Sequence, residues 1–264
     1  LTTALPVTTA DITTATTLYY TPYIGNHIAL YDGTNWNILT FSEISIAVPA
    51  TTNTNYDVFI YDSSGTATLE LLAWTSSGAG TSARATALAY QNGVLVKSGT
   101  ATRRFVGVIR TTTVSGQCAD SAQFRYCVNY YNTVLRQLTK TVASPHAYTS
   151  GTIRAWNNDT TTAGCSVYFL YAYQEDAIAI GYFSNQTPAA DGARGLVAPG
   201  LNTSTANSVF QIGTANAQQT FVGGYSTIAA GSVPVGYNYL QQTEEGHASS
   251  VTFTTTAMYV TIKG

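Results

Sequence analysis

The stretch YYTPYIGNHIALYDGTNWNILTFSEISIAV, residues 19–48, decides the fold class of this chain. It consists of short runs of β-branched and aromatic residues, which favour extended strands, separated by turn residues. Asp32-Gly33 stands between two such runs, and Asp-Gly supplies the positive φ angles that a tight hairpin needs. We therefore expect a bent strand followed by a hairpin at Asp32-Gly33, with an earlier turn at Gly25-Asn26.

The same pattern continues along the chain. Ser63-Ser64-Gly65 and Asn92-Gly93 each lie between two apolar runs, as hairpin turns do. Many short strands at a spacing of roughly ten residues are typical of sandwiches and jelly rolls. The predicted fold class is all-β, with two β-sandwich or jelly-roll-like domains and at most one short helix.

One segment carries a helical pattern. In residues 121–138, SAQFRYCVNYYNTVLRQL, apolar residues recur at three- and four-residue spacing. The segment is also rich in β-branched and aromatic residues, so a strand stays an alternative. We favour a short helix or a mixed segment here.

Turn-rich segments divide the chain. The Ser/Thr/Pro/Gly stretch TKTVASPHAYTSG predicts a boundary between an amino-terminal domain, residues 1–143, and a carboxy-terminal jelly-roll-like head, residues 144–264. A strand pair is expected to turn near residues 174–176. Residues 185–207 contain several Pro and Gly residues and predict a long loop of the kind that often carries function.

Composition excludes several classes of protein. Charged residues make up only 9% of the chain, while hydrophobic residues make up 45% and tyrosines number 19. The net charge of −2 and the absence of a basic stripe argue against nucleic-acid binding. No apolar run is long enough to insert into a membrane. The surface must therefore be solvated mainly by hydroxyl and amide groups.

Motifs for catalysis, cofactors and metals are not found in the sequence. It contains no nucleophile elbow, HExxH, P-loop or dinucleotide fingerprint, so we predict no catalytic residues and no cofactor. The adjacent pairs Glu175-Asp176 and Glu244-Glu245 would point to opposite faces of a strand, which makes neither pair a shared site. Glu244, Glu245 and His247 form a weak metal candidate that we disfavour, so no metal site is predicted.

The cysteines do not indicate a pattern of disulfide bonds. The three residues are an odd number and contain no CxxC pair. A bridge between Cys118 and Cys127 is left open, although three buried or free thiols is the favoured interpretation.

Aromatic residues are the stronger functional signal. Tyrosine and tryptophan combine a flat apolar ring with a polar tip, which suits contact surfaces and sugar rings. Tyr31, Trp36 and Trp156 are the candidate contact residues. The competing interpretation is that alternate rings fill the core of a sandwich.

Several strings of sequence agree with a known module. TTATTLYYTPYIGNHIALYDGTNWNILTFSEISIAV, YDVFIYDSSGTATLELLAW, ARATALAYQNGVLVKSGTATRRFVGVIRTTT and FRYCVNYYNTVLRQL follow in this order. Over residues 8–140 the chain resembles a β-rich module of tailed-bacteriophage virion proteins. The carboxy-terminal half is more loosely similar to the β-rich heads that follow this module.

The resemblance implies a fibre, spike or decoration protein at the virion surface, without catalysis. Its expected partners are other virion proteins and copies of itself, with a trimer as the expected oligomer. A receptor-binding protein that holds a host-surface glycan in its carboxy-terminal loops is the alternative. A glycan-degrading enzyme that uses a carboxylate such as Glu175 or Glu244 is a third hypothesis. The resemblance leaves a head or tail location open.

Overall fold

The computed structural model describes residues 1–3, 10–173, 176–214, 220–247 and 249–263. These residues form an all-β chain, which confirms the predicted fold class. Its helical turns, within this described part, are two 3-10 segments, η1 Trp156–Asn158 and η2 Ala230–Ser232.

A six-stranded antiparallel sheet forms the centre of the amino-terminal half. Its order is β7-β6-β10-β9-β8, and β13 also pairs with β10. The strands are β6 Asn55–Ser63, β7 Thr66–Ala73, β8 Leu88–Gln91, β9 Val94–Lys97, β10 Thr100–Arg110 and β13 Cys127–Asn129. Ser64-Gly65 joins β6 to β7 and Asn92-Gly93 joins β8 to β9, with positive φ at all four residues. Both predicted hairpins are therefore confirmed.

Two small sheets cover one face of this sheet. β2 Thr17–Tyr20 pairs with β5 Ile44–Ala47, and β3 His27–Tyr31 pairs with β4 Trp36–Thr40. At the β3–β4 turn, one carboxylate oxygen of Asp32 accepts hydrogen bonds from the N–H groups of Thr34 and Asn35, each at 2.7 Å. Gly33 has φ of 107°. The predicted Asp32-Gly33 hairpin is confirmed, and a local carboxylate bond holds it.

An eight-stranded sheet joins the two halves of the chain. Its order is β1-β11-β12-β16-β21-β18-β19, and β15 also pairs with β21. The strands are β1 Ile12–Ala15, β11 Cys118–Asp120, β12 Phe124–Arg125, β15 Arg154–Ala155, β16 Ser166–Tyr171, β18 Arg194–Leu201, β19 Ile212–Thr214 and β21 Gly236–His247. The junction is the short parallel pair between β12 and β16.

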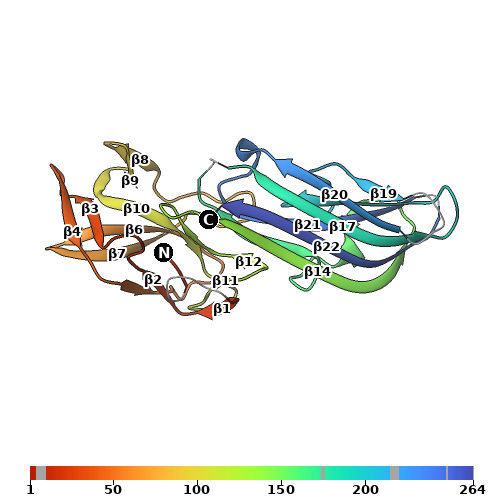
Figure 1. The fold of residues 1–264 in the computed structure, drawn as a ribbon, viewed down its shortest axis with the longest axis horizontal. Helices are drawn as coiled ribbons and strands as arrows, with labels where there is room; N and C mark the ends of the chain where they lie inside the picture. Colours follow the sequence, from red (N-terminus) through yellow and green to blue (C-terminus); the bar gives the residue numbers. More distant parts are fainter. Residues whose placement is uncertain (4–9, 174–175, 215–219, 248, 264) are drawn as a thin grey trace.

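A four-stranded sheet completes a sandwich in the carboxy-terminal half. Its order is β14-β22-β17-β20, from β14 Leu135–Tyr148, β17 Ile178–Pro188, β20 Thr220–Ile228 and β22 Val251–Lys263. Leu138, Ile180 and Val260 from this sheet pack against Val167, Phe169 and Leu240 from the eight-stranded sheet. Figure 1 shows an elongated molecule, with these long strands at one end and β3 and β4 at the other.

The division of the chain at residue 143 stays a prediction. β14 runs across residues 143 and 144, with a register shift between Ala143 and His146. Rings from both sides of this division also share one cluster, because Phe124 stacks on Tyr168 at 5.2 Å between ring centroids.

The helix predicted within residues 121–138 is wrong. This segment instead contains β12, β13 and the start of β14. Cys127 and Val128 are both buried but belong to different core clusters, as neighbouring side chains of a strand do. Gly107 lets β13 approach β10, because a Cβ at Gly107 would lie 2.2 Å from the carbonyl oxygen of Val128. Burial on two faces thus overrode the helical spacing.

The long loop predicted at residues 185–207 is also wrong over most of its length. β17 continues to Pro188, and β18 occupies Arg194–Leu201. Pro199 is tolerated in β18 because its carbonyl oxygen accepts from Ser208 N–H, away from β21. The missing N–H of Pro199 points the same way, so no bond to β21 is lost. The turn predicted near residues 174–176 lies largely outside the described residues, since 174 and 175 are not among them.

All three cysteines are buried free thiols. Burial raises the pKa of Cys118 well above its ordinary value, that of Cys127 to about 11 and that of Cys165 to about 12. The Cys118–Cys127 bridge that the sequence left open is not formed in this structure.

Candidate functional site

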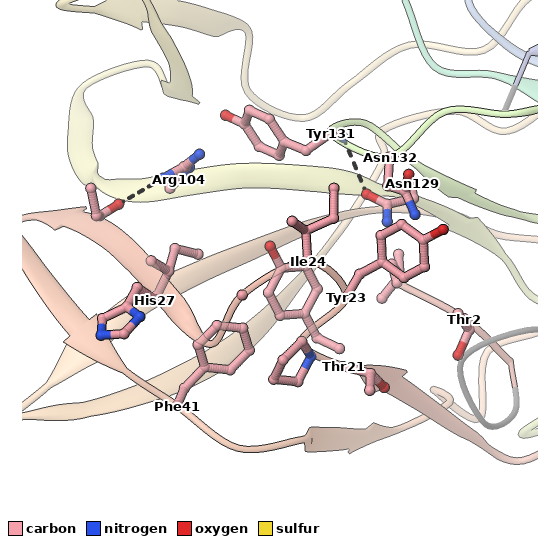
Figure 2. Close-up of a pocket in the computed structure, with 16 residues that line it drawn as sticks. Thr2, Thr21, Tyr23, Ile24, His27, Phe41, Arg104, Asn129, Tyr131 and Asn132 are labelled. Atoms are coloured by element: carbon pink, nitrogen blue, oxygen red, sulfur yellow. Dashed lines mark hydrogen bonds between the residues drawn. The ribbon is translucent and has the colours of Figure 1, made fainter.

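A pocket of about 330 Å³ opens beside the β2–β3 connection. The loop TPYIGN that follows β2 forms one wall, and β10 and the residues after β13 form the other (Figure 2). Its lining includes Tyr20, Thr21, Tyr23, Ile24, His27, Phe41, Arg104, Asn129, Tyr131 and Asn132. Residues 19–48, which decide the fold class, therefore also supply most of the pocket lining.

Arg104 provides the permanent charge of the pocket. Its Nη1 donates to the carbonyl oxygen of Ala29 at 2.9 Å, and its guanidinium carbon lies 4.5 Å from the centroid of the Tyr131 ring. A guanidinium stacked on an aromatic ring is favourable and keeps its edges free for acceptors. The backbone N–H of Tyr131 in turn donates to the side-chain oxygen of Asn129 at 3.2 Å. This wall is thus held in place by bonds between its own residues.

Aromatic rings form the facing wall. Tyr20 stacks on Phe41 with ring centroids 5.6 Å apart. Tyr23 and Ile24 are 67% and 94% exposed, which is unusual for large apolar side chains. Burial raises the pKa of Tyr20, and the positive charge of Arg104 partly offsets that rise. Figure 2 shows Arg104 and Tyr131 across the pocket from Phe41 and Thr21.

Tyr31 and Trp36 lie on the β3–β4 hairpin, outside the pocket lining. They are paired directly across the hairpin, with ring centroids 5.3 Å apart. The indole N–H of Trp36 donates to the side-chain oxygen of Asn92 at 3.3 Å, which ties this hairpin to the β8–β9 hairpin. Both rings are partly exposed. Tyr31 and Trp36 remain candidate contact residues on the β3–β4 hairpin, outside the pocket.

Trp156, the third aromatic candidate, is 1% exposed and so cannot stack on a ligand in this structure. Its ring packs edge-on against His146, which also stacks on Phe253. Trp156 therefore follows the competing interpretation, in which rings fill the core. The sequence pattern could not separate the two, because an indole suits a core and a contact surface equally well.

The carboxylate of Glu244 is completely buried in an ion-pair cluster that the sequence did not reveal. One oxygen accepts from Arg154 Nε at 2.7 Å, and the other lies 2.6 Å from His146 Nε2. His146 Nδ1 lies 2.9 Å from the carbonyl oxygen of Ser144. Both ring nitrogens of His146 therefore face acceptor oxygens, one on the backbone of β14 and one on the Glu244 carboxylate.

This cluster argues against the catalytic and metal hypotheses at Glu244. A carboxylate with no exposed surface cannot reach a polysaccharide in this conformation. Glu245 instead lies beside His247 and accepts from Gln211 Nε2 at 2.8 Å. Among the described residues, no group of three His, Cys, Asp or Glu side chains has the arrangement of a metal site. Glu175, the other proposed carboxylate, lies outside the described residues.

The outward face of the four-stranded sheet is a second candidate surface. Strand register places on it Leu135, Gln137, Thr139, Thr141, Ala143, Ala179, Gly181, Phe183, Phe221, Gly223, Tyr225, Thr227, Ala257, Tyr259 and Thr261. The same register places one charged residue on this face, Lys263 opposite Leu135 at its rim, where it pairs with Asp176 at 2.9 Å; the residues named above are uncharged. Phe221 and Tyr225 are 70% and 74% exposed. We call these residues the outer face.

Comparisons with known proteins identify no family. No protein-family model matches the chain, and no curated protein matches it. Solved structures of infectious bursal disease virus align with it weakly. The Gx-strain structure is 8% identical over 99% of this chain and 74% of that chain, with a TM-score of 0.33. The VP2 subviral particle is 10% identical over 98% and 74%, with a TM-score of 0.34.

The structure of the T13 particle of that virus is 11% identical over 96% of this chain and 67% of that chain, with a TM-score of 0.36. Likenesses of this strength establish neither a family nor a function. No helix within the described residues is long and apolar enough to cross a membrane.

Proposed function

We propose that this chain is a non-enzymatic structural subunit at the surface of a tailed-bacteriophage virion, as part of a fibre, spike or decoration protein. Its sequence strings resemble a module of such proteins over the amino-terminal half. The observation that carries the proposal is the outer face, a surface with exposed aromatic rings and one charged residue at its rim. Exposed apolar patches of this kind mark protein–protein contacts.

The arrangement of large and small side chains on the outer face is compatible with packing against the same face of another copy of the chain. Across the strands, Gly181 lies directly between Tyr225 and Tyr259, and Phe183 lies opposite Gly223. Rings therefore alternate with positions that have no side chain. A face that alternates rings with glycines, and whose one charged residue is ion-paired at the rim, is compatible with self-packing.

The outer face is large enough for a specific contact. Four strands about 4.8 Å apart, with about nine residues of about 3.3 Å each, cover roughly 570 Å². Two such faces would bury about 1,100 Å², which clears the roughly 1,000 Å² expected of a biological interface but lies just below the usual range of about 1,200–2,000 Å². In the described part of the chain β14 and β20 are the edge strands of this sheet, and edge strands are often covered by a neighbouring subunit. A face that packs on the same face of its own copy closes a two-fold pair, so the trimer that we propose from the resemblance needs a second, different contact.

Sedimentation equilibrium of the whole chain tests this proposal. We expect a mass several times the 28.0 kDa of one chain at micromolar concentration. Tyr225→Glu places a charge on an exposed side chain of the outer face and should yield monomers. Ile38→Glu changes a 73% exposed residue on β4 and should leave the mass unchanged. A monomeric wild-type chain, or equal masses for both variants, would contradict the proposal.

The virion location needs its own measurement. Antibodies against the chain should label intact phage particles at one defined position in electron micrographs. Particles that carry the gene but bind no antibody, while the purified chain does, would contradict a surface location.

A further inference from the structure

The pocket beside the β2–β3 loop has the electrostatics of an anion site. Arg104 brings a permanent positive charge, and none of the described lining residues is an aspartate or glutamate. Arg104 is only partly buried, but its Nε–H is buried without a hydrogen-bond partner, so contact with a ligand falls to its terminal Nη groups. The nearest carboxylate among the described contacts of the lining is Glu43, which accepts from the Thr21 hydroxyl at 2.6 Å on the wall opposite Arg104. An acidic group in the pocket is therefore attracted to the Arg104 side.

Arg104 has unused donor capacity. A guanidinium carries five N–H donors, and the one bond that Arg104 makes within the described residues goes from Nη1 to Ala29. The stacked Tyr131 ring holds the plane of the guanidinium in place. Since a guanidinium matches a planar carboxylate in a fork geometry, a carboxylate is the acceptor that Arg104 suits best.

The other lining residues suit a sugar ring. Tyr23 is 67% exposed, and the apolar faces of sugar rings stack on exposed tyrosine rings. Tyr131 is 43% exposed but already has Arg104 over its ring. Asn129 and Asn132 add amide groups to the lining, which sugar hydroxyls need as partners. The volume of about 330 Å³ lies at the small end of ligand sites and fits a ring-sized group better than a helix or strand.

We infer that this pocket binds a carboxylate-bearing sugar, with its carboxylate on Arg104 and its ring against Tyr23. This inference goes beyond the proposed function, because the outer face and the pocket lie on different parts of the molecule. The ligand is either a free acidic monosaccharide or an acidic unit of a polysaccharide, since both present the same ring and carboxylate.

Titration of the whole chain with D-glucuronic acid, followed by NMR, tests the inference. D-glucose is the matched neutral control, and we expect it to bind at least ten-fold more weakly. A glucuronic acid polymer should bind more tightly than the monosaccharide if the pocket serves a polysaccharide, and equally per unit if it serves the free sugar. Equal affinity for glucose and glucuronic acid, or no binding of either acidic probe, overturns the inference.

Two variants locate the binding. Arg104→Gln should reduce the affinity for glucuronic acid at least ten-fold. Arg103→Gln removes the same charge from the neighbouring residue of β10, whose side chain pairs with Glu70 and packs on Tyr61 on the other face. It should therefore bind like wild type. Equal losses in both variants would reduce the effect to net charge and overturn the assignment to Arg104.

Tyr23→Ser gives a test that does not depend on the stability of Arg104 variants. Tyr23 is 67% exposed, so its truncation should leave the fold and the sedimentation mass unchanged. We expect it to weaken glucuronic acid binding at least three-fold. Unchanged affinity in this variant, or tighter binding of a glutamate-containing tetrapeptide than of glucuronic acid, would reject a sugar as the occupant.

Discussion

Asp57 gives the chain a pH-dependent stability whose size can be worked from the structure. It lies on β6, is buried, and pairs with Arg84 Nε at 2.9 Å. Desolvation raises the pKa of Asp57 from 3.8 to about 6, although Arg84 opposes that rise. Folding therefore makes this carboxyl a weaker acid, which is the reverse of the usual ion-paired aspartate.

The sign follows from proton uptake. Between about pH 4 and pH 6 the folded state holds a proton at Asp57 that the unfolded chain has released. The free energy of unfolding that is due to Asp57 must therefore fall as pH rises through this window. A shift of about two pKa units corresponds to a fall of about 3 kcal/mol. This contribution is fully present below pH 4 and lost above pH 6.

Urea unfolding of wild type and Asp57→Asn from pH 3.5 to pH 8 measures this effect. Subtracting the two curves removes the shared contributions of other carboxyl groups, and the difference should change by about 3 kcal/mol across the window. Asp32→Asn is a control of opposite sign, because backbone hydrogen bonds from Asn35 and Thr34 lower the pKa of Asp32. A flat difference for Asp57, or one that rises with pH, would show that Arg84 outweighs desolvation.

Two further predictions concern packing. Glu244→Gln should lower the free energy of unfolding by about 3–5 kcal/mol, because it removes the buried carboxylate that accepts from Arg154 and leaves that guanidinium without its counter-charge. Glu70→Gln, whose carboxylate pairs with two cations but is 27% exposed, should cost about 1 kcal/mol or less. Comparable costs in urea unfolding would refute this reasoning. Gly107→Ala should cost about 1–3 kcal/mol by forcing β13 away from β10, whereas Gly181→Ala, whose nearest contact is 3.9 Å away, should cost far less. A stable Gly107→Ala protein with an unchanged melting temperature would contradict the close approach.

The hairpins could be predicted because their signals are local. Asp32-Gly33, Ser64-Gly65 and Asn92-Gly93 each place turn chemistry between strand-forming runs, and all three turns form. The errors arose where distant partners decide the structure. Residues 121–138 became strands because β10 and β16 offered them pairing partners.

Sites were harder to predict than strands for the same reason. The pocket joins Tyr23 to Arg104 and Tyr131, which are far apart in the sequence and carry no shared motif. His146, Arg154 and Glu244 likewise meet only through the pairing of β15 with β21 and the packing of β14 on that sheet. The runs of strand residues could be recognised, whereas the neighbours of each strand could not.

The three buried thiols make the fold chemically durable. With a pKa of about 11, the thiol of Cys127 is ionised in only about one molecule in ten thousand at neutral pH. Thiolates are the species that exchange with disulfides and react with oxidants, so these cysteines should be nearly inert while the chain stays folded. The same native structure can therefore persist in a reducing cytoplasm and in an oxidising exterior. A protein that folds inside a cell and is later released from it benefits from thiols that react in neither environment.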